Sequence, residues 1–313
     1  MRIKLTAPSS KTKTISEGFK EFNRYCRVKN LSEKTLDFYE ECLARFCKFY
    51  PEEGLLSNIT QQTVEDYILF LKTNTGFNSV SINSSLRGLR AILYYFMKTE
   101  HVPEFKIQLV KSEKNVKETY TEAELRLLLK KPDIKHCIFT EYRDWVIINY
   151  LLSTGNRLNT VINLRIGNID FENSVIMLEK TKNRKQQVVP LSKTLNKVLA
   201  EYIQYRKGEL TDYLFCSIYG EKLTSNALGH SIRKYNIKRG VGKTSIHLFR
   251  HTFAKNWILA GGDIFRLQKL LGHSSMDIVR EYVNMFSDDL QKDFDRFNPL
   301  EQIACNGTYL KMR

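Results

Sequence analysis

The chain has 313 residues, of which 42% are hydrophobic and 12% aromatic, and it carries a formal net charge of +15 at pH 7. This length and composition are sufficient for one to three domains with hydrophobic cores, and the excess of Lys and Arg favours a polyanionic partner over the alternative of a merely basic soluble protein. There is no long apolar run and no apolar leader after Met1, which predicts a cytoplasmic protein that does not span a membrane. The 6 cysteines form no Cys-x-x-Cys pair, so neither a zinc site nor a disulfide framework is expected.

Four helices are predicted in a first domain over residues 14–100, after a flexible N-terminus over residues 1–13. The first helix begins at a capping box formed by Thr14 and Glu17. The fourth has an apolar stripe at helical spacing, which predicts that it packs into the core of this domain. The stripe consists of Ile82, Leu86, Leu89, Leu93 and Phe96.

The other face of the fourth helix is polar and basic, with Asn83, Ser84, Arg87 and Arg90. Side chains of these types contact phosphates and base edges when a helix lies in a groove of DNA. A solvated helix face has the same composition, so the sequence alone leaves both interpretations open.

Residues 101–117 are predicted to be a linker, because Pro103 follows the fourth helix and a polar stretch comes after it. A second domain is expected over residues 118–298, beginning at the capping box of Thr121 and Glu124. A polar tail over residues 299–313 completes the chain.

Within the second domain, one helix is expected to end at Gly155, because glycine is a typical C-cap. The runs 175–178 and 188–191 predict the two strands of a β-hairpin. Pro190 cannot donate a ladder hydrogen bond, so its strand should lie at an edge.

Several side chains of the second domain are suited to hold a phosphate. Arg157 follows a glycine-marked turn, and Arg250 lies three residues after His247, which places both on one face of a helix. Two guanidiniums can brace the non-bridging oxygens of a phosphodiester where charge develops, and they do not deprotonate. Taken alone, the His-x-x-Arg pair is also consistent with a surface pair.

Lys182 and Tyr282 are suited to the reacting positions. Lys182 lies in the turn of the predicted hairpin, from which it could protonate a leaving oxygen; a charged hairpin tip is the alternative. A phenol with a pKa of about 10 needs help to attack at neutral pH, which arginines and histidines nearby can give. Tyr282 is one of 16 tyrosines, and its place nine residues after His273 singles it out.

These motifs together resemble those of the tyrosine recombinases of the phage integrase family, in the family's order. Residues 153–157 are similar to the first-arginine box, and Lys182 with Lys185 and residues 189–191 to the lysine box of the hairpin. Residues 245–254 resemble the His-x-x-Arg box and residues 270–274 the Leu-Gly-His box, and Tyr282 stands at the nucleophile's position. The first domain resembles the family's core-binding domain more loosely.

The resemblance implies a mainly α fold with a small β-sheet, in which a helical core-binding domain and an α+β catalytic domain form a C-shaped clamp. Tyr282 would form a 3′-phosphotyrosyl link, while Lys182 protonates the leaving 5′-oxygen. His247 would act as base or phosphate ligand, and His273 would hydrogen-bond the phosphate. The implied catalytic set is Arg157, Lys182, His247, Arg250, His273 and Tyr282, and the implied DNA contacts are Ser84, Arg87, Arg90 and Lys185.

The resemblance also implies the partners. Four protomers would hold two DNA duplexes with inverted-repeat sites and exchange strands through a Holliday junction, for integration, excision or resolution of a mobile element. Accessory DNA-bending proteins would be further partners, and the segment after Tyr282, with Leu290, Phe294 and Phe297, would dock on a neighbouring protomer. No metal or other cofactor is expected, because the arginines supply a metal's electrostatic stabilisation and the phosphotyrosine keeps the bond energy.

Two positions qualify the family pattern. The residue three after Arg157, usually acidic, is Thr160, which can still hydrogen-bond. His251 is expected to make a buried hydrogen bond beside the site and not to transfer a proton.

Two other classes of protein are alternatives. A type IB topoisomerase uses similar chemistry, but the core-binding helices and the compact size favour a recombinase. A catalytically silent DNA-binding protein would not need the complete set of six catalytic residues.

Overall fold

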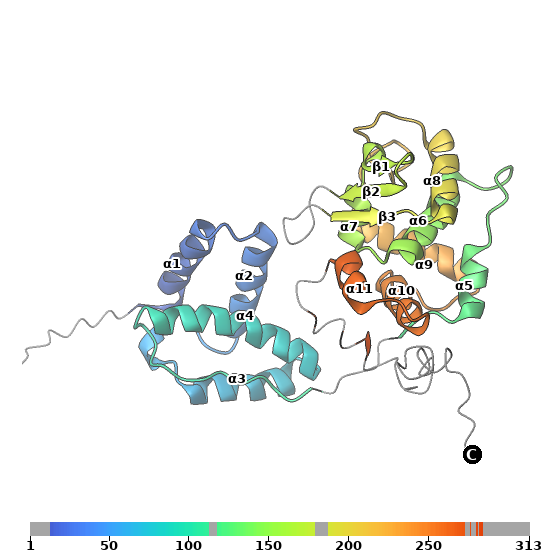
Figure 1. Ribbon diagram of the computed structural model, residues 1–313. Helices are drawn as coiled ribbons and strands as arrows, with labels where there is room; N and C mark the ends of the chain where they lie inside the picture. The colour runs from blue at the N-terminus through green and yellow to red at the C-terminus, as the bar shows by residue number, and fades with distance from the viewer. Residues whose placement is uncertain are drawn as a thin grey trace, which may run out of the picture. The chain divides into compact units, whose positions relative to one another are not determined.

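A computed structural model describes residues 13–112, 118–178, 187–272, 276, 280, 282 and 283. The chain divides into two compact units, Met1–Asn115 and Val116–Arg313. The described residues are mainly helical with one three-stranded antiparallel sheet, as predicted (Figure 1). Among them, no helix combines the length and the apolar composition that crossing a membrane requires.

The first unit is entirely helical in its described part. Its first helix starts where the sequence predicts, because Thr14 Oγ1 accepts a hydrogen bond from Glu17 N while the Glu17 carboxylate accepts one from Thr14 N. The elements are α1 (Ile15–Val28), α2 (Glu33–Cys47), the 3-10 helix η1 (Leu56–Asn58), α3 (Gln61–Asn74) and α4 (Ser79–Lys98).

Helix α4 forms the centre of the first unit and contacts α1, α2 and α3 (Figure 1). All five residues of its predicted apolar stripe are at most 2% exposed. Burial of that stripe among the other helices removes its apolar surface from water and so stabilises this unit. The stripe prediction is therefore confirmed.

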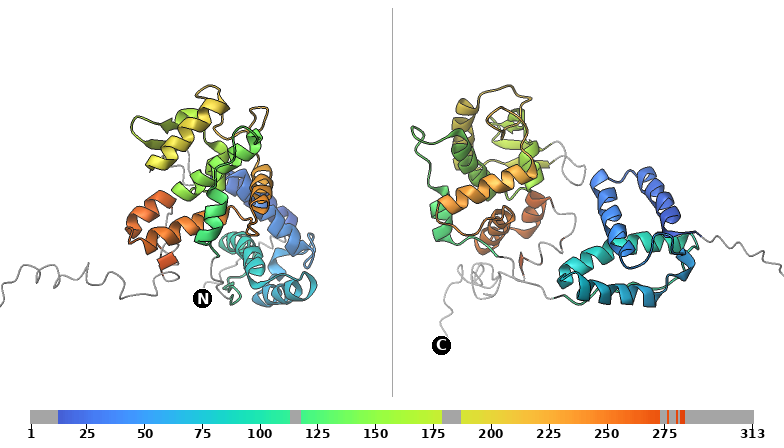
Figure 2. Two further views of the ribbon diagram at one scale, coloured as in Figure 1. Left: turned by 90° about the vertical axis from the view of Figure 1, so that its right-hand side faces the viewer. Right: turned by 180° about the vertical axis from the view of Figure 1, so that it is seen from behind.

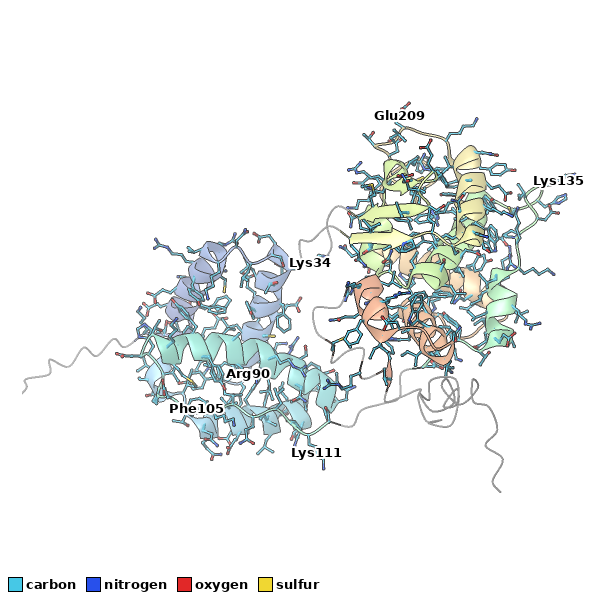
Figure 3. All side chains as sticks on the ribbon, viewed as in Figure 1. Lys34, Arg90, Phe105, Lys111, Lys135 and Glu209 are labelled. Carbon is cyan, nitrogen blue, oxygen red and sulfur yellow. The ribbon has the colours of Figure 1, made fainter. Side chains whose placement is uncertain are left out.

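The polar face of α4 differs from the prediction at one residue. Asn83 is buried, its side-chain nitrogen donates to Val110 O and its side-chain oxygen accepts from Val110 N, both at 2.8 Å. Assigning Asn83 to a DNA-facing surface is therefore wrong, because its polar groups are used inside the unit. Ser84 and Arg87 are exposed on this helix, and Arg90, labelled in Figure 3, is half-buried.

The segment after α4 packs on the first unit. Val102 and Ile107 are 3% and 4% exposed within its hydrophobic core, and residues 105–110 line a groove together with α3 (Figure 3 labels Phe105 and Lys111). Residues 101–110 are thus part of this unit, whereas the sequence placed a linker there. Helix α4 ends at Lys98 with Thr99 as its C-cap, before Pro103 is reached, and the chain after it continues to pack on this unit.

The second unit is built around α6, which contacts α5, α8, α9 and α10. The view from behind in Figure 2 shows α9 running across one side of this unit. The first helix of this unit, α5, starts at the predicted capping box of Thr121 and Glu124. The helices are α5 (Glu122–Leu129), α6 (Phe139–Thr154), α7 (Leu158–Asn163), the 3-10 helix η2 (Ile166–Asn168), α8 (Lys193–Arg206), α9 (Ser225–Lys238), α10 (His247–Leu259) and α11 (Ile264–Leu271).

A small antiparallel sheet completes the second unit, with strands β1 (Ile169–Asp170), β2 (Val175–Leu178) and β3 (Gln187–Pro190) in that order. Ile176 pairs with Val189 and Val175 with Pro190, so the predicted hairpin and the edge position of the Pro190 strand are confirmed. The sequence did not predict β1, whose two residues are too few for an alternating pattern. The hairpin turn, residues 179–186, lies outside the described residues.

Candidate active site

Arg157 is positioned by the end of α6. Gly155 caps that helix with a left-handed backbone (φ 62°), as the sequence predicts, and Arg157 then starts α7 as its N-cap. A Cβ on Gly155 would lie 2.6 Å from Phe253 Cδ1 on α10 and 2.8 Å from Leu271 Cδ2 on α11. Only glycine allows α10 and α11 to approach the end of α6 this closely, and this approach brings Arg157 to them.

The end of α11 supplies the acceptors for two arginines. Arg250 donates from Nη1 to Gly155 O and from Nη2 to Leu271 O, both at 2.8 Å. Arg157 Nη1 donates to Leu271 O at 3.3 Å and to Gly272 O at 3.4 Å. The carbonyl end of a helix carries partial negative charge, which suits it to hold guanidiniums. Two residues that are 93 positions apart in the sequence thus meet at one carbonyl.

Gln187 ties the β-hairpin to the same helix end. Its side-chain nitrogen donates to Lys269 O and Leu270 O, both at 2.8 Å, in the last turn of the helix, and Lys269 O also accepts from Gly272 N at 3.0 Å. Gly272 ends α11 with φ 60°, and a Cβ there would lie 3.0 Å from Gln187 Oε1 and 3.7 Å from Arg157 Nη1. Strand β3, the end of α11 and Arg157 therefore form one packed corner.

Tyr282 is buried at this corner. Its side chain is 2% exposed and belongs to a small apolar cluster with Ala254, Leu267 and Leu271. The hydroxyl lies 2.6 Å from His251 Nδ1, and it is also hydrogen-bonded by the Arg250 side chain. The hydroxyl is thus held by two consecutive residues of α10.

The electrostatics of the corner favour an anion. Burial and, second to it, the charge of Arg157 lower the pKa of Arg250 to about 10, against an opposing contribution from Tyr282. Burial also lowers the pKa of Arg157, while the nearby Tyr282 raises it. Both guanidiniums remain charged at neutral pH, and an anion between them would offset their mutual repulsion and their desolvation.

The structure brings together three of the six predicted catalytic residues, namely Arg157, Arg250 and Tyr282. His247 is the first residue of α10 and is exposed. Lys182, Lys185 and His273 lie outside the described residues.

Two contributors to the site were not anticipated in their actual form. His251 does make a hydrogen bond beside the site, but its partner is the hydroxyl of Tyr282 itself. Gln187 gave no sequence signal, because a glutamine at the start of a strand is ordinary and its partners lie 82 and 83 residues away.

Thr160 donates its backbone N–H to Arg157 O in the first turn of α7. Within the described ranges, no group of three or more His, Cys, Asp or Glu side chains is arranged to hold a metal ion.

The fold is that of a family of enzymes that act on DNA. The phage integrase family matches residues 118–288, and the N-terminal SAM-like domain of phage integrases matches residues 19–104. The chain therefore belongs to the phage integrase family. It is a tyrosine-type site-specific recombinase by class.

Relatives match over nearly the whole chain. The tyrosine recombinase XerD of Staphylococcus haemolyticus is 25% identical over 291 residues, which cover 89% of this chain and 97% of the relative. The tyrosine recombinase XerC of Staphylococcus aureus is 28% identical over 295 residues, covering 91% and 96%. The Tn1549 transposon integrase in complex with transposon right end DNA shares the fold with a TM-score of 0.71, at 20% identity and covering 91% and 99% of the two chains.

Proposed function

We propose that this chain cuts and rejoins DNA strands at specific sites through a covalent bond to Tyr282. The observation that carries the proposal is the convergence of the Tyr282 hydroxyl with the guanidiniums of Arg250 and Arg157. Tyr282 Oη attacks the phosphorus and forms a 3′-phosphotyrosyl bond, while the bond from phosphorus to the 5′-oxygen breaks. The leaving 5′-oxygen takes a proton from Lys182. The 5′-hydroxyl of a second strand then reverses these steps and rejoins the DNA.

The two arginines would bind the scissile phosphate from their position at the end of α11. Both donate to backbone carbonyls, which are neutral. An ionised phosphate oxygen is a stronger acceptor than a carbonyl, and two phosphate oxygens can take two parallel bonds from one guanidinium. A guanidinium has five N–H donors, so Arg157 and Arg250 can bind the phosphate while the carbonyls at the end of α11 still hold them. The phosphate would also offset the charge repulsion by which Arg157 lowers the pKa of Arg250.

The remaining predicted residues complete the assignment. His247 and His273 would bind the phosphate, and Lys185 would contact DNA beside Lys182. In the helical domain, over residues 14–100, Ser84, Arg87 and Arg90 on α4 would contact the duplex, and the catalytic domain would extend over residues 118–298. The exposure of Ser84 and Arg87 supports this role, because both side chains are accessible to a phosphate backbone.

At the level of the assembly, we propose that four copies act on two duplexes and pass through a Holliday junction. The DNA partner would carry inverted repeats, in the cytoplasm, and the outcome would be integration, excision or resolution of a mobile element with accessory DNA-bending proteins. The family membership supports this proposal, as does the shared fold with an integrase that was solved together with transposon DNA.

A selection from random duplexes tests the function. The full-length protein should select inverted repeats around a short crossover, and a nicked duplex with that sequence should trap a protein–DNA adduct that survives SDS. Specific binding without an adduct would indicate a silent DNA-binding protein. Relaxation of supercoils without exchange between two sites would indicate a topoisomerase.

A further inference from the structure

His251 contacts the reacting atom of the proposed nucleophile. Its Nδ1 lies 2.6 Å from the hydroxyl oxygen of Tyr282, at the short end of the range for a hydrogen bond, and the two rings are 5.6 Å apart between centroids. Resting on the function proposed above, we propose that His251, rather than His247, accepts the hydroxyl proton of Tyr282 as it attacks the phosphorus.

The direction of the hydrogen bonds defines the proton's position. Arg250 hydrogen-bonds the Tyr282 side chain, and a guanidinium has donors only, so the hydroxyl oxygen accepts this bond. With the proton of neutral His251 on Nε2, Nδ1 accepts the hydroxyl hydrogen of Tyr282. This is the state in which a histidine acts as a base.

His247 has a different environment. It is exposed at the first residue of α10, one helical turn before His251, and no hydrogen bond among the described residues joins it to Tyr282. An exposed imidazole at the start of the helix is suited to reach a DNA phosphate from the solvent side. The buried hydroxyl is reached by His251.

The charges around the hydroxyl explain why transfer would occur only with DNA bound. Arg250 and Arg157 both interact electrostatically with Tyr282, and these two cations favour the phenolate but oppose a third positive charge on His251. A phosphate held by the two arginines adds negative charge at the point where the imidazolium forms. Proton transfer is thus coupled to the presence of the scissile phosphate.

The step is balanced. The bond from Tyr282 Oη to phosphorus forms while the O–H bond breaks, and the proton moves to His251 Nδ1. The bond from phosphorus to the 5′-oxygen breaks, and that oxygen receives its proton from Lys182. In the rejoining step His251 returns its proton to Tyr282 Oη as the phosphotyrosyl bond breaks.

The test is single-turnover cleavage of the nicked duplex selected by the protein, with full-length His251→Gln and His251→Ala. Glutamine can still accept a hydrogen bond from the hydroxyl but cannot take its proton, so His251→Gln should lower the cleavage rate by about 10²–10⁴-fold. DNA binding should stay as in the wild type. In His251→Gln the acidic limb of the pH–rate profile should disappear, and added imidazole should partly restore His251→Ala.

Two further variants separate this role from others. His136→Gln changes an exposed histidine that is bonded to Asp133, far along the sequence from the site, and should leave the rate unchanged. His247→Gln should lower the rate and keep the acidic limb. A 5′-bridging phosphorothiolate, whose leaving group needs no acid, should not restore His251→Gln, because the base is still missing.

Wild-type cleavage rates in His251→Gln would overturn the inference, since a hydrogen-bond acceptor would then be sufficient. So would loss of the acidic limb in His247→Gln with its retention in His251→Gln. Absence of any adduct with the wild-type protein would instead overturn the proposed function on which this inference rests.

Discussion

Replacing Gln187 with Met tests whether the corner between β3 and α11 positions the arginines. Methionine has about the same length and volume but no hydrogen-bond donor, so the change removes the two 2.8 Å bonds to Lys269 O and Leu270 O. Each net hydrogen bond contributes about 0.5–1.5 kcal/mol, and Gln187 is half-buried, so water can replace part of the loss. We expect the interaction between β3 and the end of α11 to become weaker by about 1–2 kcal/mol.

That helix end holds the acceptors of Arg157 and Arg250, so its loosening should misplace both guanidiniums. If the whole loss appears in the transition state, single-turnover cleavage slows by roughly 5- to 30-fold. The matched control is the nearly isosteric substitution Val188→Thr. Val188 is the next residue of the same strand, and it is 59% exposed. Equal cleavage rates for Gln187→Met and Val188→Thr on the selected nicked duplex would refute this coupling.

Three further predictions concern the chemistry and the DNA. Lys182→Ala should lose cleavage of an ordinary phosphodiester far more than of a 5′-bridging phosphorothiolate. If the phosphorothiolate instead restores cleavage by Lys185→Ala and not by Lys182→Ala, the general acid is Lys185. Adduct formation should continue in excess EDTA, because the proposed mechanism uses arginines to stabilise the phosphate; full loss that magnesium restores would contradict it. DNA affinity should fall steeply with salt, with a log–log slope of about −5 for some six phosphate contacts, and a nearly flat dependence measured by titration would contradict contacts from both units.

Local signals in the sequence predicted the local structure well. The bonds between Thr14 and Glu17 and between Thr121 and Glu124 span three residues, so a short motif contains both partners. The left-handed backbone of Gly155 is likewise a property of a single residue at a helix end. The stripe on α4 was correct because helical spacing decides which side chains share a face.

Long-range partners could not be predicted in this way. Asn83 looked like a surface residue because a polar side chain satisfied by Val110, 27 residues away, has the same sequence pattern as an exposed one. The meeting of Arg157 and Arg250 at the carbonyl of Leu271 was implied by the family resemblance, but the acceptor was not. The hydrogen bond between His251 and Tyr282 joins residues that are 31 positions apart, so no local signal in the sequence indicated it.

The measurement that tests the central claim most directly is the identity of the residue bonded to DNA. The adduct formed on the nicked duplex is digested with protease and nuclease, and the nucleotide-bearing peptide is identified by mass spectrometry. The account predicts a nucleotide on Tyr282, and it predicts that Tyr282→Phe binds the same DNA with nearly unchanged affinity but forms no adduct. A nucleotide on another tyrosine, or an adduct with Tyr282→Phe, would contradict the account.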